Sequence, residues 1–177
     1  MNQLRKAAVV VASAVMTTMT LTSQAHAGYP LEYNVMIYSG TGQNLCLDAD
    51  GSHGLYAGDP VKLWPCSSGD SYEAWDLHDD LTISPHSNSD LCLDASDPTG
   101  TLAVGAAVQI WYCNGGSNQQ WGGALGNAVN WYNGAVSNGT FLYLDANASS
   151  PVQAGTPVEV WTLNHGSNQG WAWAPRS

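Results

Sequence analysis

The sequence has few basic residues, and this scarcity narrows the choice of partners. Of its 177 residues, four are Lys or Arg and fourteen are Asp or Glu. A surface this acidic repels phosphate backbones, anionic lipids and sulfated glycans. We therefore expect no nucleic-acid partner, whereas a neutral ligand is compatible with the charge.

Long apolar runs are also missing, except near the start. A short basic stretch precedes the apolar run Ala7–Val15, and Ala25-His26-Ala27 has the small residues of a signal-peptidase site. We expect residues 1–27 to be a secretory signal peptide and residues 28–177 to form a single domain of a secreted protein. An uncleaved membrane anchor is the alternative, but the threonines after Val15 thin the apolar stretch that a span needs. Cleavage would leave two basic residues against fourteen acids, a net charge of −12.

What the chain does contain is one unit that occurs three times, at about residues 33–78, 79–125 and 126–177. Each unit has a Leu-Asp pair, a glycine, an apolar segment ending in Trp, and a second Trp ten or eleven residues later. The Asp and the first Trp are 16, 17 and 16 residues apart. The aligned residues are Asp48, Gly58, Trp64 and Trp75 in repeat one, Asp94, Gly105, Trp111 and Trp121 in repeat two, and Asp145, Gly155, Trp161 and Trp171 in repeat three.

Inside each repeat the segments are short, rich in β-forming residues and separated by Gly, Pro, Asn and Ser, without helical periodicity. We expect about four strands in each repeat, with Tyr33–Tyr38 and Leu81–Ser84 as two of them. Units this small cannot each bury a hydrophobic face, so the three must share one core. The sequence therefore predicts an all-β fold with pseudo-threefold symmetry.

Four cysteines in an exported chain suggest two disulfides, for which three pairings are possible. Repeats one and two each have two cysteines at aligned places, and in repeat three both places change together, to Tyr143 and Leu163. Joint loss is what a bond within each repeat would produce. The expected pairs are Cys46–Cys66 and Cys92–Cys113. No closely spaced cysteine pair of the zinc-binding kind is present, and we expect no metal and no cofactor.

The strand that ends in the first Trp predicts an exposed aromatic ring. Alternate residues of a strand point to opposite faces, so Val108 and Ile110 would face the core while Gln109 and Trp111 point outward. The same pattern pairs Lys62 with Trp64 in repeat one and Glu159 with Trp161 in repeat three. An outward indole beside a polar side chain, three times over, indicates a ligand.

A sugar fits this combination of side chains. One face of a pyranose carries C–H groups that pack on an aromatic ring, and its rim carries hydroxyls that donate and accept. Each Leu-Asp carboxylate can accept two hydroxyl protons in strong, charge-assisted hydrogen bonds. Gln109, Asn118 and Asn168 offer both donors and acceptors. We therefore predict a carbohydrate partner.

The residues also carry a specific resemblance. The segments Leu63-Trp64-Pro65-Cys66, Asn118-Gln119-Gln120-Trp121 and Asn168-Gln169-Gly170-Trp171, each downstream of a Leu-Asp pair, resemble the Gln-x-Trp repeats of ricin-B-type lectins and of carbohydrate-binding modules from bacterial xylanases. The resemblance covers about residues 33–174. It implies a β-trefoil with up to three shallow sites for galactose- or xylose-type sugars.

The resemblance also implies a role for each aligned residue. The early Asp binds hydroxyls, the strand Trp stacks on the sugar, the Asn adds hydrogen bonds, the following Gln supports the Asp, and the last Trp belongs to the core. Repeat two has the full set, Asp94, Gln109, Trp111, Asn118 and Gln119. Repeat three has Asp145, Glu159, Trp161, Asn168 and Gln169, where Glu159 replaces Gln but still accepts hydrogen bonds. Repeat one has Asp48, Lys62, Trp64, Tyr72 and Glu73.

Repeat one departs furthest from the pattern. Glu73 beside Asp48 would repel that carboxylate rather than support it, unless Lys62 compensates. We expect its site to be weak or inactive. Outside the aligned motifs, we expect Trp131 and Trp173 to pack and the scattered histidines to lie in solvated loops: His53, His78, His86 and His165.

Two other functions fit this pattern of residues less well than sugar binding does. Asp145 and Glu159 could act as a glycosidase carboxylate pair, but the positions aligned with Glu159 hold Lys and Gln, and no catalytic motif is present. An interaction protein of the same fold, such as a hydrolase inhibitor or a targeting subunit with decayed sugar sites, does not need Asp, Trp and Asn repeated in register. Turn capping is the structural alternative for the three aspartates.

Overall fold

The computed structural model describes residues 30–125 and 130–177 of the chain. The predicted signal peptide, residues 1–27, lies outside the described residues, as do the first four residues assigned to the third repeat. No helix within the described ranges is long and apolar enough to cross a membrane.

Each repeat contributes four of the twelve strands found in the described residues, as expected, and a 3-10 helix that the sequence did not suggest. The strands are β1 (Pro30–Ser39), β2 (Leu45–Ala49), β3 (Val61–Pro65), β4 (Trp75–His78), β5 (Ile83–Pro85), β6 (Leu91–Ala95), β7 (Val108–Tyr112), β8 (Trp121–Gly122), β9 (Tyr132–Ser137), β10 (Thr140–Ala146), β11 (Val158–Trp161) and β12 (Trp171–Pro175). The 3-10 helices are η1 (Ser71–Glu73), η2 (Ser117–Gln119) and η3 (Ser167–Gln169).

The two strands predicted by residue range are both present. β1 includes Tyr33–Tyr38, whereas β5 begins two residues later than expected. Leu81 precedes β5 in a turn with a φ of 70°. The His78 N–H donates to the Thr82 carbonyl across that turn, so the extended conformation starts only at Ile83.

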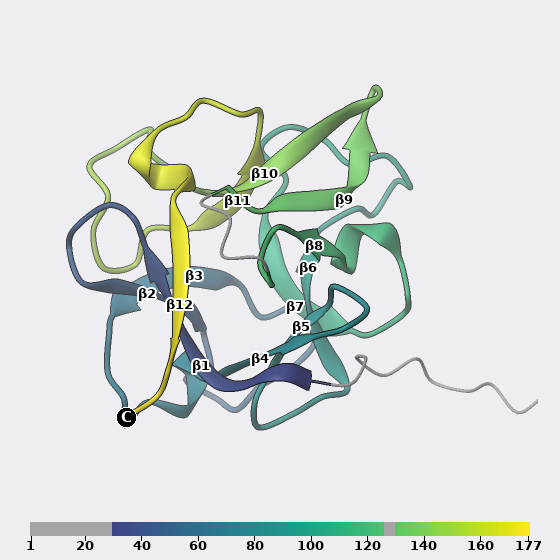
Figure 1. Cartoon of the computed structure of the whole chain (residues 1–177). Helices are drawn as coiled ribbons and strands as arrows, with labels where there is room; N and C mark the ends of the chain where they lie inside the picture. Colours follow the sequence, from purple (N-terminus) through teal and green to yellow (C-terminus); the bar gives the residue numbers. More distant parts are fainter. Residues whose placement is uncertain (1–29, 126–129) are drawn as a thin grey trace, which may run out of the picture.

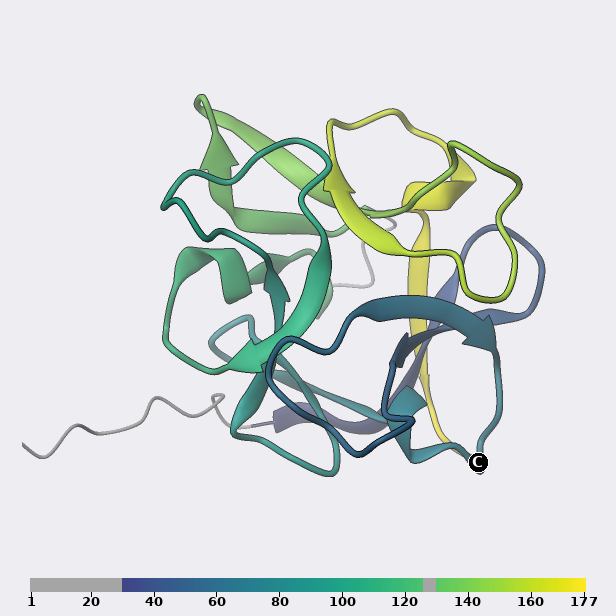
Figure 2. The same cartoon turned by 180° about the vertical axis from the view of Figure 1, so that it is seen from behind.

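A hairpin in each repeat carries both the Leu-Asp pair and the first Trp: β2–β3, β6–β7 and β10–β11. Their register sets Asp48 opposite Lys62, Asp94 opposite Gln109 and Asp145 opposite Glu159. Three strand pairs join the repeats: β1 with β12, β4 with β5, and β8 with β9. Within repeat one, β1 also pairs with β2 and β4. The three repeats surround a common centre, with repeat one in blue, repeat two in teal and repeat three in green to yellow (Figures 1 and 2).

The core forms where alternate residues of these strands point inward. Val108 and Ile110 are buried while Trp111 is exposed, which confirms the predicted alternation. The second Trp of each repeat is also buried, and its indole N–H donates to a backbone carbonyl, so its one polar group is satisfied. These bonds run from Trp75 to Leu47 (2.9 Å), from Trp121 to Leu93 (2.9 Å) and from Trp171 to Leu144 (2.8 Å). Trp131 is buried and Trp173 packs against the core, as expected.

The repeats interlock in a ring of backbone hydrogen bonds. The N–H of the loop glycine in each repeat donates to the Trp-bearing strand of the next: Gly58 to Ile110, Gly105 to Val160 and Gly155 to Leu63, each at 2.8 Å. The three glycines have φ values of 100°, 81° and 86°, in the left-handed region that disfavours a side chain. Each hairpin is therefore positioned by the loop of another repeat.

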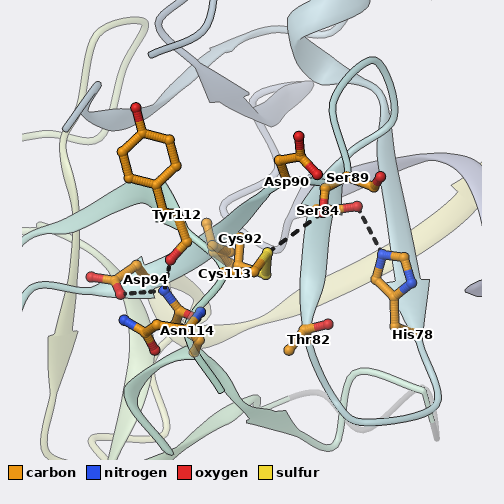
Figure 3. The surroundings of a disulfide bond; sticks show 12 residues. His78, Thr82, Ser84, Ser89, Asp90, Cys92, Asp94, Tyr112, Cys113 and Asn114 are labelled. Atoms are coloured by element: carbon orange, nitrogen blue, oxygen red, sulfur yellow. Dashed lines mark hydrogen bonds between the residues drawn. A yellow bond between two sulfur atoms is a disulfide. The ribbon is translucent and has the colours of Figure 1, made fainter. Parts of the chain in front are cut away.

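Both predicted disulfides are present, Cys46–Cys66 and Cys92–Cys113. Each joins β2 or β6 to the end of the following strand, closing a loop of about 20 residues that contributes roughly 3 kcal/mol in the chain-entropy model. Figure 3 shows the Cys92–Cys113 bond between Asp94 on one side and the His78–Ser84 pair on the other. In repeat three the cysteine place on β10 is taken by Tyr143, whose ring contacts that of Tyr132.

His78 does not lie in a solvated loop, as we expected for the histidines. It ends β4 and is 2% exposed. Its Nε2 lies 2.7 Å from the hydroxyl of Ser84 on the paired strand β5 (Figure 3). Strand pairing, which sequence spacing did not reveal, turns this ring inward.

Candidate functional site

Three hollows of similar size lie at equivalent places in the three repeats, with volumes of about 260, 290 and 260 Å³ in chain order. Each is lined by the Leu-Asp carboxylate, the exposed strand Trp and the loop that follows the Asp. Site one is lined by Asp48, Asp50, Gly51, Ser52, Lys62, Trp64, Asp70 and Tyr72. Site two is lined by Asp94, Ser96, Asp97, Pro98, Gln109, Trp111, Asn114 and Asn118. Site three is lined by Asp145, Asn147, Ala148, Ser149, Glu159, Trp161, Asn164 and Asn168.

The three strand tryptophans share one environment. Trp64, Trp111 and Trp161 are 43%, 40% and 41% exposed. One edge of each ring lies over the loop glycine of another repeat: a methyl group added at Gly105 would come within 3.1 Å of the Trp161 ring. The neighbouring repeat thus holds one edge of the indole, while about two-fifths of the side chain stays open to a ligand.

Site two is organised around the carboxylate of Asp94, which is 2% exposed. Its Oδ1 accepts from Gln109 Nε2 at 3.1 Å. Its Oδ2 accepts from Asn118 Nδ2 and from Gln119 Nε2, both at 2.9 Å. Three of roughly four acceptor positions of the carboxylate are thus in use. About one remains for a hydroxyl group, fewer than the two that the residue type alone suggested.

The amides at site two are held by the 3-10 helix η2. Gln119 is fully buried, its Nε2 also donates to the Tyr112 carbonyl at 2.9 Å, and its Oε1 accepts from the Asn114 N–H at 2.9 Å. Gln119 therefore ties β6, β7 and η2 together through one side chain. This is the supporting role that the family resemblance implied for it.

Burial raises the pKa of Asp94, and the hydrogen bonds from Gln119, Gln109 and Asn118 oppose that rise. Three donors held at fixed positions stabilise the ionised form. The site thus presents an oriented carboxylate next to an exposed indole. This arrangement can bind a hydroxyl-bearing ring that has one apolar face.

Site three repeats the framework with changed contacts at Asn164, whose Nδ2 donates to Asp145 Oδ2 at 3.5 Å, and at Glu159. Asn168 Nδ2 donates to Asp145 Oδ2 at 2.9 Å, and Gln169 bridges the Thr162 carbonyl and the Asn164 N–H as Gln119 does in repeat two. Glu159 cannot donate to Asp145 as Gln109 does to Asp94. Instead its Oε2 accepts from Asn147 Nδ2 at 3.1 Å.

The two carboxylates of site three lie on directly paired residues. Burial raises the pKa of Asp145, opposed by the amides of Gln169 and Asn168. Burial and then the charge of Asp145 raise the pKa of Glu159. The substitution at residue 159 therefore keeps an acceptor, as expected, but it also places a second negative charge beside Asp145.

Site one has an equivalent hairpin and 3-10 helix but a different set of side chains. Glu73 is fully buried at the place of Gln119; its Oε2 accepts from the Ser67 N–H at 2.6 Å, and its Oε1 has no hydrogen-bond partner. Burial raises its pKa to about 7, and the charge of Asp48 adds to that rise. The expected repulsion between Glu73 and Asp48 is therefore present.

Lys62 is directed away from that pair of carboxylates. Its Nζ lies 2.9 Å from Asp50 Oδ2 and 4.8 Å from the centre of the Trp64 ring. Burial, followed by the charge of Asp70, raises the pKa of Asp48 to about 6, and Lys62 lowers it only in part. The Tyr72 ring occupies the space next to Gly51, where a Cβ atom would clash with it.

The structure brings all fifteen predicted residues to the three sites, either in the lining or, for the buried Glu73, Gln119 and Gln169, directly beneath it. Sequence reasoning missed Asn114 and Asn164, although each precedes a Gly-Ser-Asn-Gln segment repeated in the chain. It also missed the second loop residue, which is Asp50, Ser96 or Asn147. That position differs in every repeat, so a search for identical residues could not find it.

Comparison with known proteins agrees with this architecture. A family model described as a ricin-type beta-trefoil lectin domain matches residues 33–171. No curated protein sequence matches the chain significantly. Three similar solved structures each share less than a quarter of their residues with this chain.

The first is the β-trefoil lectin of a Vibrio vulnificus hemolysin/cytolysin, solved with N-acetyl-D-lactosamine bound (22% identity, TM-score 0.63, 82% of this chain and 96% of that chain). The second is a designed threefold-symmetric protein, ThreeFoil (23% identity, TM-score 0.58, covering 80% of this chain and 96% of that chain). The third is a non-toxic homologue of type II RIPs from Momordica charantia (bitter gourd), in complex with α-methyl-D-galactoside. It shares 20% identity at a TM-score of 0.58, and the match covers 80% of this chain and 46% of that chain. These likenesses confirm the predicted β-trefoil.

Proposed function

The chain belongs to the ricin-type β-trefoil lectin domain family, and on that premise we propose that it is a secreted, non-catalytic protein that binds galactose- or xylose-type glycans through sites two and three. The observation that carries the proposal is the Asp94 carboxylate. It is oriented by three amides and lies in one hollow with the exposed Trp111 ring. A sugar ring stacked on Trp111 would present its hydroxyls to Asp94 and Asn118.

Two features of the sites favour binding over catalysis. The carboxylates of Asp145 and Glu159 belong to directly paired residues of one hairpin, on the floor of an open hollow rather than on opposite walls of a cleft. The aligned residues in the other repeats are Lys62 and Gln109, so no second copy of the pair exists. A glycosidase needs two carboxylates that flank the scissile bond.

Several sites on one protein favour polymeric ligands. A shallow site of this size holds one sugar with a Kd of about 1 mM, or roughly −4 kcal/mol. Two sites that engage one chain or one glycan-rich surface raise the apparent affinity by about 100-fold or more. We therefore expect polysaccharide to bind far more tightly than the matching monosaccharide; equal affinities would contradict a multivalent mode.

The test is a calorimetric titration of the protein with lactose, xylo-oligosaccharides and soluble xylan. Galactosides come first because two similar structures hold N-acetyl-D-lactosamine and α-methyl-D-galactoside. We expect saturable binding that is lost in the Trp111→Ala, Trp161→Ala double variant and kept in the matched Trp64→Ala variant. Binding that survives in the double variant would remove sites two and three from the proposal.

Export is the other part of the proposal. Two disulfides in a chain of this size are typical of an oxidising compartment. On expression of the full chain we expect protein in the culture medium that begins at Gly28, measured by intact mass. Protein that stays in the cell and retains residues 1–27 would contradict it.

A further inference from the structure

One position in the three hairpins carries three different charges. The residue directly opposite the Leu-Asp carboxylate is Lys62 in repeat one, Gln109 in repeat two and Glu159 in repeat three. Its side chain lines the hollow in all three sites. Sites with one common framework therefore offer a ligand a cation, a neutral amide or an anion at the same place.

Site one shows how this framework holds an ammonium group. The Lys62 Nζ lies 2.9 Å from the Asp50 carboxylate and 4.8 Å from the centre of the Trp64 ring. An ammonium over an indole is attracted to the ring electrons as well as to the carboxylate. In site one the chain itself supplies this cation and occupies the aromatic ring with it.

Site three has the same ring and two carboxylates, Asp145 and Glu159, but its lining, as far as the structure describes it, contains no Lys or Arg. Glu159 accepts a hydrogen bond from the amide of Asn147, and Asp145 accepts one from the amide of Asn168. Neither amide carries a charge. The two basic residues of the described ranges contact other groups: Lys62 contacts Asp50, and Arg176 contacts Asn34 and the Ser68 carbonyl. Like charges on directly paired residues of a hairpin disfavour one another. A ligand that brings a positive charge would relieve this repulsion.

We propose that site three prefers sugars with a protonated amino group, whose ammonium binds Glu159 and Asp145 while the ring stacks on Trp161. Glu159 is then the residue that sets this specificity, because it lies directly opposite Asp145. In site two that place holds the neutral Gln109, and the second carboxylate of the lining, Asp97, lies in the loop after Asp94 instead, so site two prefers neutral sugars. The inference rests on the proposed function, because it names the class of sugar for one of the same sites. It also predicts different sugar preferences for sites two and three, which their shared Asp, Asn and Trp would not.

The test follows the indole N–H signals of Trp161 and Trp111 by NMR while galactosamine, N-acetylgalactosamine and galactose are added in turn. Acetylation removes the charge and leaves the ring in place. At about pH 7 and roughly 150 mM salt, where long-range attraction to an acidic protein is screened, we expect galactosamine to bind at Trp161 about five- to tenfold more tightly than the two neutral sugars. Trp111 should show no such preference.

The matched variants are Glu159→Gln, which should remove the preference at Trp161, and Glu32→Gln on β1, which makes the same charge change away from the sites and should keep it. Equal affinity of the three sugars at Trp161, or an equal response to ethanolamine, an ammonium without a sugar ring, would overturn the inference while leaving sugar binding intact. If neither indole responds to any of the sugars, the proposed function itself fails.

Discussion

Sites one and two have nearly the same backbone, yet their central carboxylates are in opposite surroundings. In site two three amides donate to Asp94. In site one the aligned Asp48 faces further carboxylates, among them Asp70 and Glu73, and the one nearby ammonium is bonded to Asp50. The comparison teaches that the hairpin and the 3-10 helix set the positions of the side chains, whereas a few residue identities decide whether amides or carboxylates surround the central Asp.

The largest effect should come from removing the aromatic ring at each site. Trp111→Ala should weaken sugar binding at site two by about 30-fold or more, or roughly 2 kcal/mol, because buried aromatic contacts dominate such interfaces. Trp64→Ala should leave sugar binding unchanged, since Lys62 already lies over that ring. Titrations of the two variants measure this. Equal losses in both would mean that site one also binds sugar and that the contrast between the sites is wrong.

The next effect concerns stability. Glu73→Gln should stabilise the protein by about 1–2 kcal/mol at pH 8. The substitution removes a buried charge and replaces the unpartnered Oε1 by an amide N–H that can donate to Asp48, as Gln119 donates to Asp94. Gln119→Glu, the reverse exchange in repeat two, should destabilise it by a similar amount. Denaturant unfolding of both variants measures the difference.

The pH dependence of these variants has a definite sign. The pKa of Glu73 rises from its ordinary value of 4.5 to about 7 on folding, so the folded state binds this proton more strongly than the unfolded chain. The binding of this proton contributes fully to the free energy of unfolding below pH 4.5, and the contribution is lost as the pH rises through 7. The gain from Glu73→Gln should therefore grow between these values. A gain that stays constant with pH would show that ionisation of Glu73 is not its cause.

The smallest effect should come from converting one site into the other. The triple variant Lys62→Gln, Tyr72→Asn, Glu73→Gln gives repeat one the side chains of repeat two. It should raise the apparent affinity for a polysaccharide about threefold by adding a third weak site, and the Trp64 indole N–H should respond to sugar. No response at Trp64 would place the difference between the sites in the loop residues Asp50 and Asp70 instead.

Much of this protein could be predicted because its chain repeats. The three-fold recurrence of Asp, Gly and Trp predicted the shared core, and the short β-forming segments between turn residues predicted about four strands in each repeat. The cysteine places that change together in repeat three predicted both disulfides. Alternation along Val108–Trp111 predicted which side chains are buried, since a strand has a strict two-residue period. These properties depend on the spacing of residues along the chain, which can be read directly from the sequence.

Contacts between repeats could not be predicted in this way. The edge of Trp161 lies over Gly105 of the preceding repeat, and the buried His78 faces Ser84 across two paired strands. The place of Asn147, the partner of Glu159, follows from a loop whose residues differ in every copy. Spacing along a chain does not specify which loop will lie beside which ring.

The sequence by itself determined the family and, through that resemblance, the β-trefoil fold, together with the disulfide pairs and the five aligned residues of each site. Only the tertiary structure decided how those residues bond: that Asp94 receives three amides, that Lys62 turns to Asp50 rather than to Asp48, and that Glu73 is left with an unpartnered oxygen. The physical reason is distance. Hydrogen bonds and ion pairs act over about 3 to 4 Å, and such distances are set by the packing of three repeats rather than by residue type.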